Sequence, residues 1–399
     1  MTDSPSAERA PRILLFTIQT SHPGSCRLPK YLRAAGFHVG VLGLPRSLIL
    51  ASSHADARYT LMARRFEPMI RASVERAFRS FRPDIVVPCD ERAVSVVGSW
   101  LGRQAPPLSA GLVRCLRRSL GSIETFTQRY SKLETLAMAR EAGVDCPRDT
   151  QVDSLQACEA AAAAFGYPVV LKISHGAGGA GVVLCRDPEA LRTTWAEFSS
   201  RYTKAKSLRR KLLRRSWFGE GHSFLVQEYV GGRPAMSCAS ALEGRSLSVV
   251  SGMVGATSGR MGPASVTTIC RHPGIEDATA RMVARMGASG FISFDFVIAE
   301  DGAVKLVECN PRPTQILHLA PLIGVDPAKA LREALAGGAW TPQAPAPGIE
   351  VAFFPQEWKR DCASPALTRA YHDVPWDDPA LLRAILGKRP RNWLGRPVP

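Results

Sequence analysis

A decisive pattern lies between residues 291 and 313, which read FISFDFVIAEDGAVKLVECNPRP. Two apolar runs, over residues 291–298 and 304–309, flank the Gly-containing turn Ala299-Glu-Asp-Gly302. Apolar runs of this length joined by a short turn predict a β-hairpin. The few polar side chains of this hairpin are therefore candidates for a functional site.

Three of these polar side chains carry oxygen ligands. Glu308 and Asn310 lie on the same side of their strand, and pairing across the turn can bring Asp295 beside them. Two carboxylates and an amide oxygen are costly to bury among apolar residues unless a cation or hydrogen bonds compensate. Such hard oxygen ligands, completed by phosphate, suit Mg²⁺, or Mn²⁺ in its place. The pattern predicts a metal site here, although a surface position and a turn cap would also explain a Glu and an Asn at a strand end.

Arg312 follows within the turn Asn310-Pro-Arg-Pro313. The two prolines stiffen this turn, which would hold the guanidinium beside the metal site. A guanidinium in a fixed position suits bidentate binding of a phosphoryl or carboxylate group. We therefore expect Arg312 to bind a phosphoryl or carboxylate group beside the metal site.

A glycine-rich loop, His175-Gly-Ala-Gly-Gly-Ala-Gly181, precedes the hairpin in the chain. It satisfies the dinucleotide fingerprint G-x-G-x-x-G, but that fingerprint requires a helix to begin inside the glycines. Here a strand-like run, Pro168–Ile173, precedes the loop and another, Val182–Cys185, follows it. The arrangement predicts a hairpin tip whose backbone N–H groups can close over phosphates, with Lys172 beside them. An ordinary glycine-rich turn next to a surface lysine is the alternative.

The N-terminal region alternates strands with helices. Apolar runs predict strands at residues 13–18, 39–44 and 84–88. Helical periodicity predicts helices at residues 28–35 and 66–81. Buried parallel strands that alternate with helices predict an α/β domain at residues 12–105.

The middle of the chain is mixed. We expect helices at residues 132–142, 155–165 and 276–288, and strands at residues 224–230 and 247–253. From Trp340 onward the chain is rich in Pro, so we expect the tail to wrap around the body or to be partly irregular.

The composition excludes several classes of protein. The chain has 399 residues, enough for two or three domains, and 45% of them are hydrophobic, which is ordinary for a globular protein. No run approaches the about 18 apolar residues that a membrane span needs. The 10 cysteines form no CxxC pair and the chain begins without a signal-peptide pattern, so we expect reduced thiols and a cytoplasmic location.

The order of these parts resembles the ATP-grasp superfamily, and within it the carboxylate-amine ligases and the carbamoyl-phosphate-synthase-like members. The resemblance covers residues 12–335 and rests on an α/β domain followed by Lys132, by Lys172 with its glycines, by Gln227-Glu-Tyr-Val230 and by the hairpin. It implies an α/β pre-ATP-grasp domain followed by an α+β ATP-grasp fold whose two subdomains clamp ATP. The implied division is an ATP-grasp domain at residues 120–338, with a lid subdomain at 166–230, and a short C-terminal extension at 339–399.

The resemblance also implies a role for each matching residue. Lys132 and Lys172 would contact the ATP phosphates, and the loop with His175, Gly178, Gly179 and Gly181 would close over them. Gln227, Glu228, Tyr229 and Val230 would form the linker between the two halves of the grasp, where Glu228 and the backbone of the next two residues read the adenine edge. Asp295, Glu308 and Asn310 would hold one or two Mg²⁺ ions, and Arg312 and Lys172 would act in catalysis, with Arg312 stabilising an acyl phosphate. The loop that contains Asp90 and Glu91 would face the acceptor site.

The implied reaction begins with attack of a carboxylate on the γ-phosphorus of ATP. An amine then displaces phosphate from the acyl phosphate to give an amide, ADP and inorganic phosphate. The alternatives are an ATP-dependent carboxylase or phosphotransferase, and a non-catalytic nucleotide-binding scaffold protein.

One departure from the family pattern bears on the substrate. Many members carry Gly-x-Glu after the linker, whereas this chain has Gly231-Gly-Arg-Pro-Ala235. The identity of the carboxylate and of the amine is left open, and a homodimer is the default expectation.

A basic stretch at residues 201–215 contains eight Lys or Arg residues and no acidic residue, against a formal net charge of +16 for the chain. A basic helix of this kind could contact polyanions, a membrane surface or an acidic substrate, and a solvated insertion between lid strands is the alternative. Nucleic-acid binding is not favoured, because the stretch belongs to no known nucleic-acid-binding module. Arg260 and Arg271 are candidates for holding a substrate carboxylate, with a flexible surface turn as the alternative.

Overall fold

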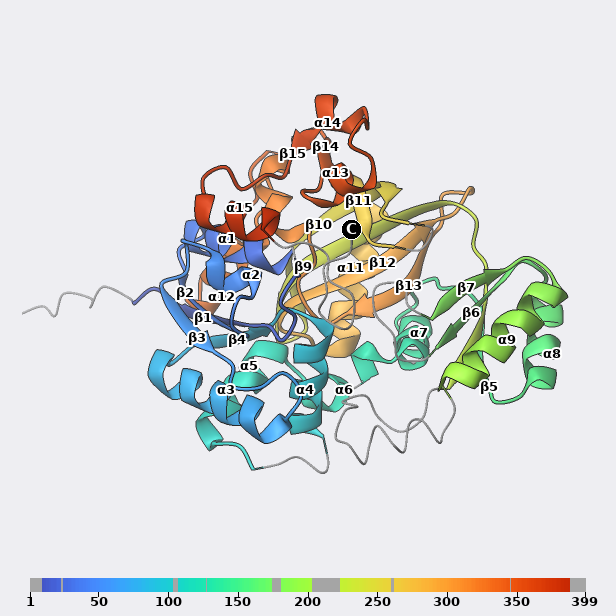
Figure 1. Ribbon diagram of the computed structural model, residues 1–399, viewed down its shortest axis with the longest axis horizontal. Coiled ribbons are helices and arrows are strands. Elements are labelled where there is room, and N and C mark those ends of the chain that lie inside the picture. The colour runs from blue at the N-terminus through green and yellow to red at the C-terminus, as the bar shows by residue number, and fades with distance from the viewer. Residues whose placement is uncertain are drawn as a thin grey trace, which may run out of the picture.

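The structure is a computed structural model that describes residues 9–22, 24–102, 107–126, 128–173, 181–202, 223–259, 262–344 and 346–387. Three β-sheets organise these residues (Figure 1). A parallel sheet near the N-terminus and a small sheet of the middle region lie at opposite ends, and a large sheet lies between them.

The N-terminal sheet is parallel and has the strand order β3-β2-β1-β4. Its strands are β1 (Arg12–Phe16), β2 (His38–Gly43), β3 (Ala57–Thr60) and β4 (Ile85–Pro88). The accompanying helices are η1 (Ser25–Arg27), α1 (Leu28–Ala34), α2 (Leu48–Ala51), α3 (Glu67–Phe81), α4 (Glu91–Leu101) and α5 (Ala110–Leu120). The strands β1 and β4 are almost entirely buried, as expected for a parallel sheet covered on both faces.

Asp90 joins the carboxyl ends of β1 and β4. Its side chain is fully buried and caps α4 by accepting from the backbone N–H groups of Arg92 (3.0 Å) and Ala93 (2.9 Å). Its other oxygen accepts from the backbone of Ile18 (2.7 Å) and Gln19 (2.9 Å). Asp90 is therefore occupied in holding the two loops together, which leaves Glu91 as the acidic residue of this loop that can face a site.

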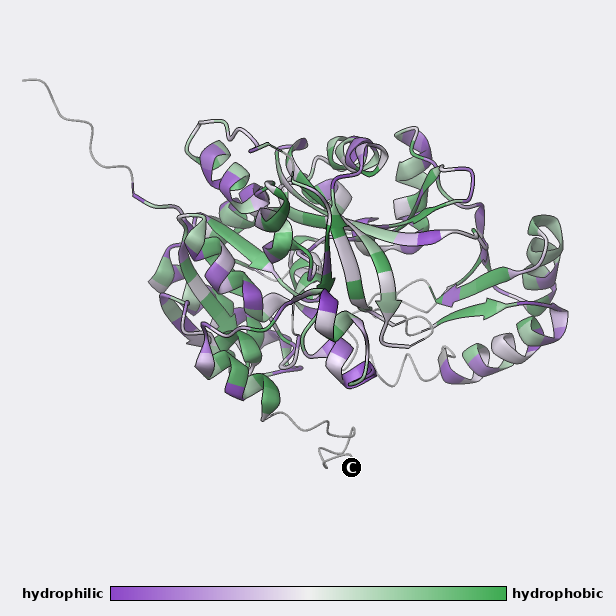
Figure 2. Ribbon diagram, turned by 90° about the horizontal axis from the view of Figure 1, so that it is seen from above, coloured by the Kyte–Doolittle hydropathy of each residue, from purple (hydrophilic) through white to green (hydrophobic). Residues whose placement is uncertain are grey.

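The large sheet has the strand order β13-β12-β9-β10-β11-β14-β15. Its strands are β9 (Arg233–Leu242), β10 (Arg245–Thr257), β11 (Ala264–Cys270), β12 (Gly290–Ile298), β13 (Val304–Asn310), β14 (Ile349–Ala352) and β15 (Tyr371–His372). Helices beside it are α6 (Ile123–Phe126), η2 (Gln128–Tyr130), α7 (Lys132–Glu141), α11 (Pro273–Met286), η3 (Leu317–Ile323) and α12 (Pro327–Leu335). Figure 2 shows hydrophobic strands at the centre and helices around them that carry many hydrophilic residues.

The two faces of the large sheet pack into different cores. Ala235, Ala239 and Ala241 of β9 pack in the core that includes α11. Cys238 of β9 and Val250 of β10 pack in the core that includes residues of β1 and β2 of the N-terminal sheet. The N-terminal region and the large sheet are thus joined by a continuous core.

The small sheet has the strand order β5-β8-β6-β7, with β5 (Asp149–Val152), β6 (Val169–Ile173), β7 (Val182–Cys185) and β8 (Phe224–Glu228). Helices α8 (Leu155–Phe165) and α9 (Pro188–Tyr202) cover one face, on which Val169, Leu171 and Val226 are buried. Because side chains alternate along a strand, Lys172 and Gln227 lie on the opposite face. This alternation presents polar residues away from the helices.

The C-terminal region adds β14 and β15 to the edge of the large sheet and contains α13 (Gln356–Arg360), α14 (Ala366–Arg369) and α15 (Pro379–Leu386). Leu381 and Ile385 of α15 pack against Leu48 of α2. Asp373 accepts from Nε2 of His318 at 2.9 Å, and its carboxylate lies 3.5 Å from Nε of Arg27. The described part of the tail is therefore regular structure that packs on both the N-terminal region and the large sheet, which is more order than its proline content indicates.

Candidate functional site

The acidic residues of the β12–β13 hairpin lie side by side. Asp295 pairs directly with Glu308 across the two strands, and Asn310 pairs with Ser293 two positions along the ladder. The Asn310 amide donates to Oδ2 of Asp295 at 2.9 Å. The register therefore brings together the three residues that the sequence predicts as metal ligands.

The electrostatics of this hairpin favour binding of a cation. Burial, together with the negative charge of Glu308, raises the pKa of Asp295 to about 6. A divalent cation would remove this repulsion between the two carboxylates. No three His, Cys, Asp or Glu side chains gather as a metal site among the described residues, so the protein offers two carboxylates and an amide. That donor set fits Mg²⁺, which commonly takes one or two carboxylates and completes its shell with water and phosphate oxygens.

Two lysines reach the hairpin from different elements. Lys132 is the first residue of α7, whose N-cap is Ser131, and its Nζ lies 2.6 Å from Oε1 of Glu308. Lys172 comes from β6 of the small sheet, and only 6% of this residue is exposed. Burial lowers the pKa of Lys172 to about 8, and the positive charge of Lys132 acts in the same direction. Both cations are thus held against the acidic hairpin, where an anionic ligand would relieve their mutual repulsion.

Arg312 connects the hairpin to the N-terminal region. Its Nη2 contacts Oε1 of Glu91 and lies 3.3 Å from Oδ1 of Asn310. The hydroxyl of Ser293 donates to the backbone carbonyl of Arg312 at 2.9 Å, which fixes the turn. The Nε atom of Arg312 is buried without a hydrogen-bond partner in the structure. A ligand oxygen at this position could therefore accept a hydrogen bond from a guanidinium that is already held in place.

His22 and Glu91 complete the wall opposite the hairpin. Burial and the charge of Arg312 lower the pKa of His22. Burial opposes ionisation of Glu91, but the positive charges of Arg312 and His22 outweigh it and lower the pKa of this carboxyl. The backbone N–H of Ser25 donates to Nδ1 of His22 at 3.2 Å, so both residues take part in the turn after β1. Sequence reasoning placed Glu91 near an acceptor site but did not anticipate its contact with Arg312.

The linker between the two halves differs in one respect from the expected arrangement. The carboxylate of Glu228 accepts from Arg148 at 3.2 Å (Nη2) and 3.3 Å (Nε), on a solvent-exposed side of the linker. Tyr229 is exposed, whereas Gln227 is buried. The side chain of Glu228 is therefore engaged by an arginine in this structure, and Gln227 is the linker side chain that faces the interior.

A cavity of about 10 Å³ lies beside the lysines. It is lined by Lys132, Leu136, Asp149, Lys172, Leu225, Gln227 and Val307. This volume holds about one water molecule. Asp149 was missed by the sequence analysis: its Oδ2 is buried without a hydrogen-bond partner, while Oδ1 contacts Arg140. The signal that could have identified Asp149 is its position opposite Gln227 in the pairing of β5 with β8. That pairing is not apparent from the sequence alone.

The glycine loop is described only at its end. Residues 174–180, with His175, Gly178 and Gly179, lie outside the described residues. Gly181 has φ +76°, and a Cβ there would come within 2.5 Å of the side chain of Ile173. Strands β6 and β7 are antiparallel, with Lys172 opposite Val182. Strand β7 follows the glycines, as the sequence analysis predicts, whereas a dinucleotide fingerprint needs a helix there.

The glycine pair after the linker has a structural reason. Gly232 has φ +139°, and a Cβ there would lie 2.1 Å from the carbonyl oxygen of Ile298. Glycine is therefore required where β9 begins beside β12. This requirement accounts for Gly232 and leaves open which residue replaces the Glu that many relatives carry nearby.

Other predicted residues lie away from the hairpin or beyond the described part. Residues 203–222, which include most of the basic stretch, and Arg260 lie outside the described residues. Arg271 forms hydrogen bonds of 2.9 and 2.7 Å to Glu276, which occupies its guanidinium. No helix within the described ranges is long and apolar enough to cross a membrane.

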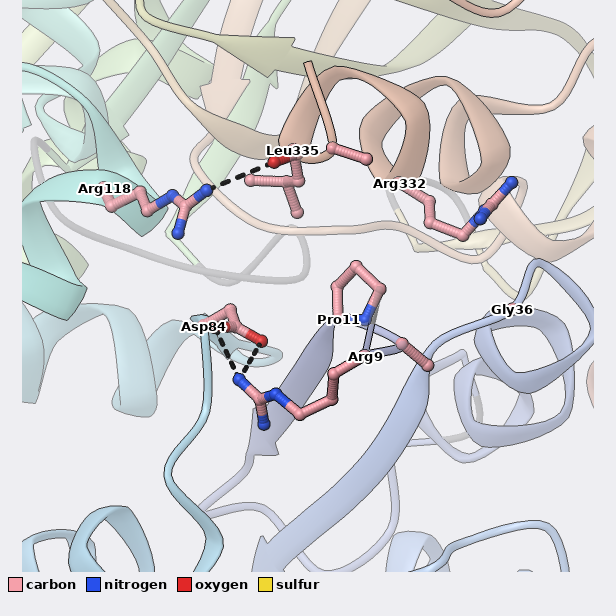
Figure 3. Close-up of a pocket in the computed structure, with 9 residues that line it drawn as sticks. Arg9, Pro11, Gly36, Asp84, Arg118, Arg332 and Leu335 are labelled. Atoms are coloured by element: carbon pink, nitrogen blue, oxygen red, sulfur yellow. Dashed lines mark hydrogen bonds and ion pairs between the residues drawn. The ribbon is translucent and has the colours of Figure 1, made fainter. Parts of the chain in front are cut away.

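A cavity of about 340 Å³ lies at a different place, between the N-terminal region and α12 (Figure 3). Arg9, Asp84, Arg118 and Arg332 contribute to its lining, and Arg9 bonds both carboxylate oxygens of Asp84 at 3.1 Å. Pro11 and Asp84 precede β1 and β4, so the cavity adjoins the amino ends of these strands. The acidic hairpin instead faces the carboxyl ends, where ligands of open α/β sheets are usually bound.

Comparisons with known proteins agree with this arrangement. The family described as the ATP-grasp domain matches residues 130–315. The match includes both lysines, the linker, the acidic hairpin and Arg312. The chain contains an ATP-grasp domain.

A curated relative of this chain is the N-terminal section of the carbamoyl phosphate synthase large chain of Methanopyrus kandleri. The two are 24% identical over 210 residues, which are 50% of this chain. The aligned part spans only 34% of that relative's length. The match to its sequence is therefore partial.

Two solved structures share the ATP-grasp fold over most of the chain. One is the biotin carboxylase domain of Hydrogenobacter thermophilus 2-oxoglutarate carboxylase, a dimer in complex with MgADP, ADP and bicarbonate. It has a TM-score of 0.58 and is 15% identical to this chain, and the comparison covers 82% of this chain and 70% of that structure's chain. The L-amino acid ligase of Bacillus licheniformis has a TM-score of 0.55, 15% identity, and coverage of 86% and 80%. At this identity the similarity establishes the fold, and it extends beyond the ATP-grasp domain into the N-terminal α/β region.

Proposed function

We propose that the protein is an ATP- and Mg²⁺-dependent ligase that activates a carboxylate as an acyl phosphate and couples it to an amine, with release of ADP and phosphate. The observation that carries the proposal is the pairing of Asp295 with Glu308 in an ATP-grasp domain, with Lys132 and Lys172 held against them and Arg312 beside them. The relatives include a carbamoyl phosphate synthase section and an amino acid ligase, which adds support.

The site residues would act mainly by positioning and electrostatics. Mg²⁺, when bound by Asp295, Glu308 and Asn310, would neutralise charge on the phosphate oxygens. Lys172 carries a pKa of about 8, so it is largely protonated at neutral pH, and a phosphate beside it would raise that pKa. Lys132 would leave Glu308 for the nucleotide when the carboxylate takes the cation. Binding of the nucleotide and Mg²⁺ would thus replace the repulsion between Asp295 and Glu308, and between the two lysines, by attraction to the ligand.

Arg312 would orient the carboxylate that is phosphorylated. Its unpartnered Nε can donate to a substrate or acyl-phosphate oxygen, while Nη2 keeps its contact with Glu91. The glutamate thus holds the guanidinium in place from the N-terminal region. We infer that the acceptor binds between Glu91 and the hairpin, where water is partly excluded.

Nucleotide binding tests the proposal first. Calorimetry with ATP, with and without Mg²⁺, would compare the full chain with a Glu308→Ala/Asn310→Ala variant and with Asp301→Asn, an exposed carboxylate in the turn of the same hairpin. We expect micromolar binding whose Mg²⁺-dependent part is lost in the double variant and kept in Asp301→Asn. Absence of ATP binding to the unmodified chain under both conditions would refute the proposal.

Product analysis separates the reaction classes. Release of ADP and phosphate would be followed over pairs of carboxylates and amines, and the product mass identifies what was formed. An amide product supports the ligase proposal, whereas a phosphorylated or carboxylated acceptor would indicate a phosphotransferase or a carboxylase instead.

We also propose that the protein is a homodimer located in the cytoplasm. Light scattering of the purified chain tests the oligomeric state, and fractionation of the cells tests the location.

A further inference from the structure

The cavity at the amino ends of β1 and β4, away from the acidic hairpin, is large enough for a small molecule. Its volume is about 340 Å³, and small-molecule sites begin at about 300 Å³. Its lining combines the N-terminal region with Arg118 of α5 and with Arg332 of α12. The cavity therefore lies where three separate parts of the chain meet.

Arg118 and Arg332 lie along one side of this cavity (Figure 3). Nη2 of Arg118 lies 3.5 Å from the backbone carbonyl oxygen of Leu335, which follows Arg332 by three positions and so lies on the same face of α12. The aliphatic stem of Arg332 packs on Gly36, where a Cβ would come within 3.0 Å of its Cδ atom. These contacts hold both guanidinium groups at the cavity.

The two guanidinium groups carry hydrogen-bond donors that no described residue accepts. Nε of Arg332 is buried and has no partner within the described part of the chain. Arg118 forms no ion pair with any carboxylate that the structure describes, and its contact with the carbonyl of Leu335 is long compared with the usual N–H···O distance of about 2.9 Å. Because a guanidinium has five N–H donors, most of those on Arg118 are open to a ligand.

The carboxylates in contact with the lining arginines are already engaged. Both oxygens of Asp84 accept from Arg9 at 3.1 Å, and Oδ2 also accepts from a backbone N–H at 2.7 Å. Glu333 accepts from Arg332. These pairs offset the charges of Arg9 and Arg332, but they leave the charge of Arg118 without a described partner. The cavity therefore has a surplus of positive charge and of N–H donors, which favours an anionic ligand.

We propose that this cavity binds a small anion through the guanidinium groups of Arg118 and Arg332, and that the recognised group is a phosphate or a carboxylate. Both kinds of group accept paired hydrogen bonds from a guanidinium. The site is separate from the acidic hairpin, so the proposal does not rest on the ligase function. Because the cavity joins α5 to α12, the bound anion would link these helices and stabilise the folded protein.

Titration of the full chain with inorganic phosphate and with citrate, by calorimetry at constant ionic strength, tests the proposal. Arg118→Gln and Arg332→Gln each remove one guanidinium. Arg117→Gln is the matched control, because Arg117 is an exposed residue of the same helix that does not line the cavity. We expect affinity for the anion to fall about tenfold in each cavity variant and to stay unchanged in Arg117→Gln. Arg118→Lys keeps the charge without the paired donors and should recover part of the affinity.

The two anions distinguish the possible sources, since tighter binding of phosphate indicates a phosphorylated ligand and tighter binding of citrate a carboxylate. Thermal unfolding confirms that each variant is folded and gives a second readout. The anion should raise the melting temperature of the unmodified protein and of Arg117→Gln more than that of Arg118→Gln.

Phosphate could also bind at the position of the nucleotide phosphates, so Lys172→Gln is titrated in parallel and should keep the affinity of the cavity. Equal affinity in Arg118→Gln and Arg117→Gln, loss of binding only in Lys172→Gln, or no binding of either anion up to about 50 mM would overturn the proposal. MgATP binding is measured on the same samples and should be the same in Arg118→Gln as in the unmodified chain. This measurement separates failure of the anion site from failure of the ligase proposal.

Discussion

Replacing Asp295 by Asn should stabilise the ligand-free protein while removing its metal-dependent function. Burial and Glu308 raise the pKa of Asp295 to about 6 from an ordinary aspartate value near 4. One pKa unit corresponds to about 1.4 kcal/mol, so the ionised carboxylate costs the native state about 3 kcal/mol relative to the unfolded chain. An Asn at this position can still accept from Asn310 and carries no charge against Glu308.

The pH dependence gives the sign of this effect. Because the pKa is raised on folding, the native state binds the proton more tightly, and stability falls as the pH rises from about 4 to about 6. The Asp295→Asn variant escapes this loss. Its gain in the free energy of unfolding should be about 1 kcal/mol at pH 4.5 and about 3 kcal/mol at pH 7.5.

Urea unfolding at both pH values would measure the gain, with thermal unfolding as a second readout. Asp301→Asn in the hairpin turn is the matched control, since its carboxylate is exposed, and it should change stability little at either pH. Added Mg²⁺ should stabilise the unmodified protein more than the variant. A variant that is less stable than the unmodified chain at pH 7.5, or equally stabilised at both pH values, would refute the reasoning about charge repulsion in the hairpin.

Three other substitutions test separate contacts. Asp373→Ala leaves the buried guanidinium of Arg27 without its carboxylate, so it should lower the free energy of unfolding, measured in urea, by about 3 kcal/mol. The C-terminal region should then detach from the N-terminal region and become more sensitive to limited proteolysis. Asp149→Asn replaces a carboxylate of the cavity wall whose Oδ2 has no hydrogen-bond partner. It should reduce the preference for ATP over GTP in competition binding if Oδ2 accepts from the adenine amino group, and an unchanged preference would exclude the contact. Arg148→Ala breaks an exposed pair with Glu228, so unfolding should show a loss of at most about 1 kcal/mol, while a larger loss would mean that the linker depends on this pair.

Local pattern was enough to predict the hairpin. The turn at residues 299–302 joins two apolar runs, and in the observed pairing of β12 with β13 Asp295 lies opposite Glu308, in agreement with the prediction that pairing across the turn can bring them together. The two lysines were also placed near this hairpin, because the order of motifs along the chain resembles a known superfamily. Predictions of this kind succeed where the residues are close in sequence or belong to a recognisable order.

Of the strands of the large sheet that the sequence analysis missed, β9 and β11 have a clear physical reason. Strand β9 consists mainly of small residues such as Ala235, Cys238 and Ala239, which have little intrinsic strand preference. It forms because both of its faces are packed, by α11 on one side and by the core shared with the N-terminal sheet on the other. Strand β11 likewise exists through its neighbours β10 and β14, the second of which lies in the proline-rich tail.

The sequence by itself determined the alternation of strands and helices, the hairpin with its carboxylates, and the lysines that belong to the same family pattern. These features depend on periodicity and spacing, which are properties of short segments. The contact of Glu91 with Arg312, the burial of Asp149 and the docking of Asp373 on Arg27 were decided only by the tertiary structure. Each of these features joins residues tens to hundreds of positions apart or depends on strand pairing. The shifted pKa values of Asp295 and Lys172, which favour binding of a cation and of phosphate, likewise come from burial and neighbouring charges that exist only after folding.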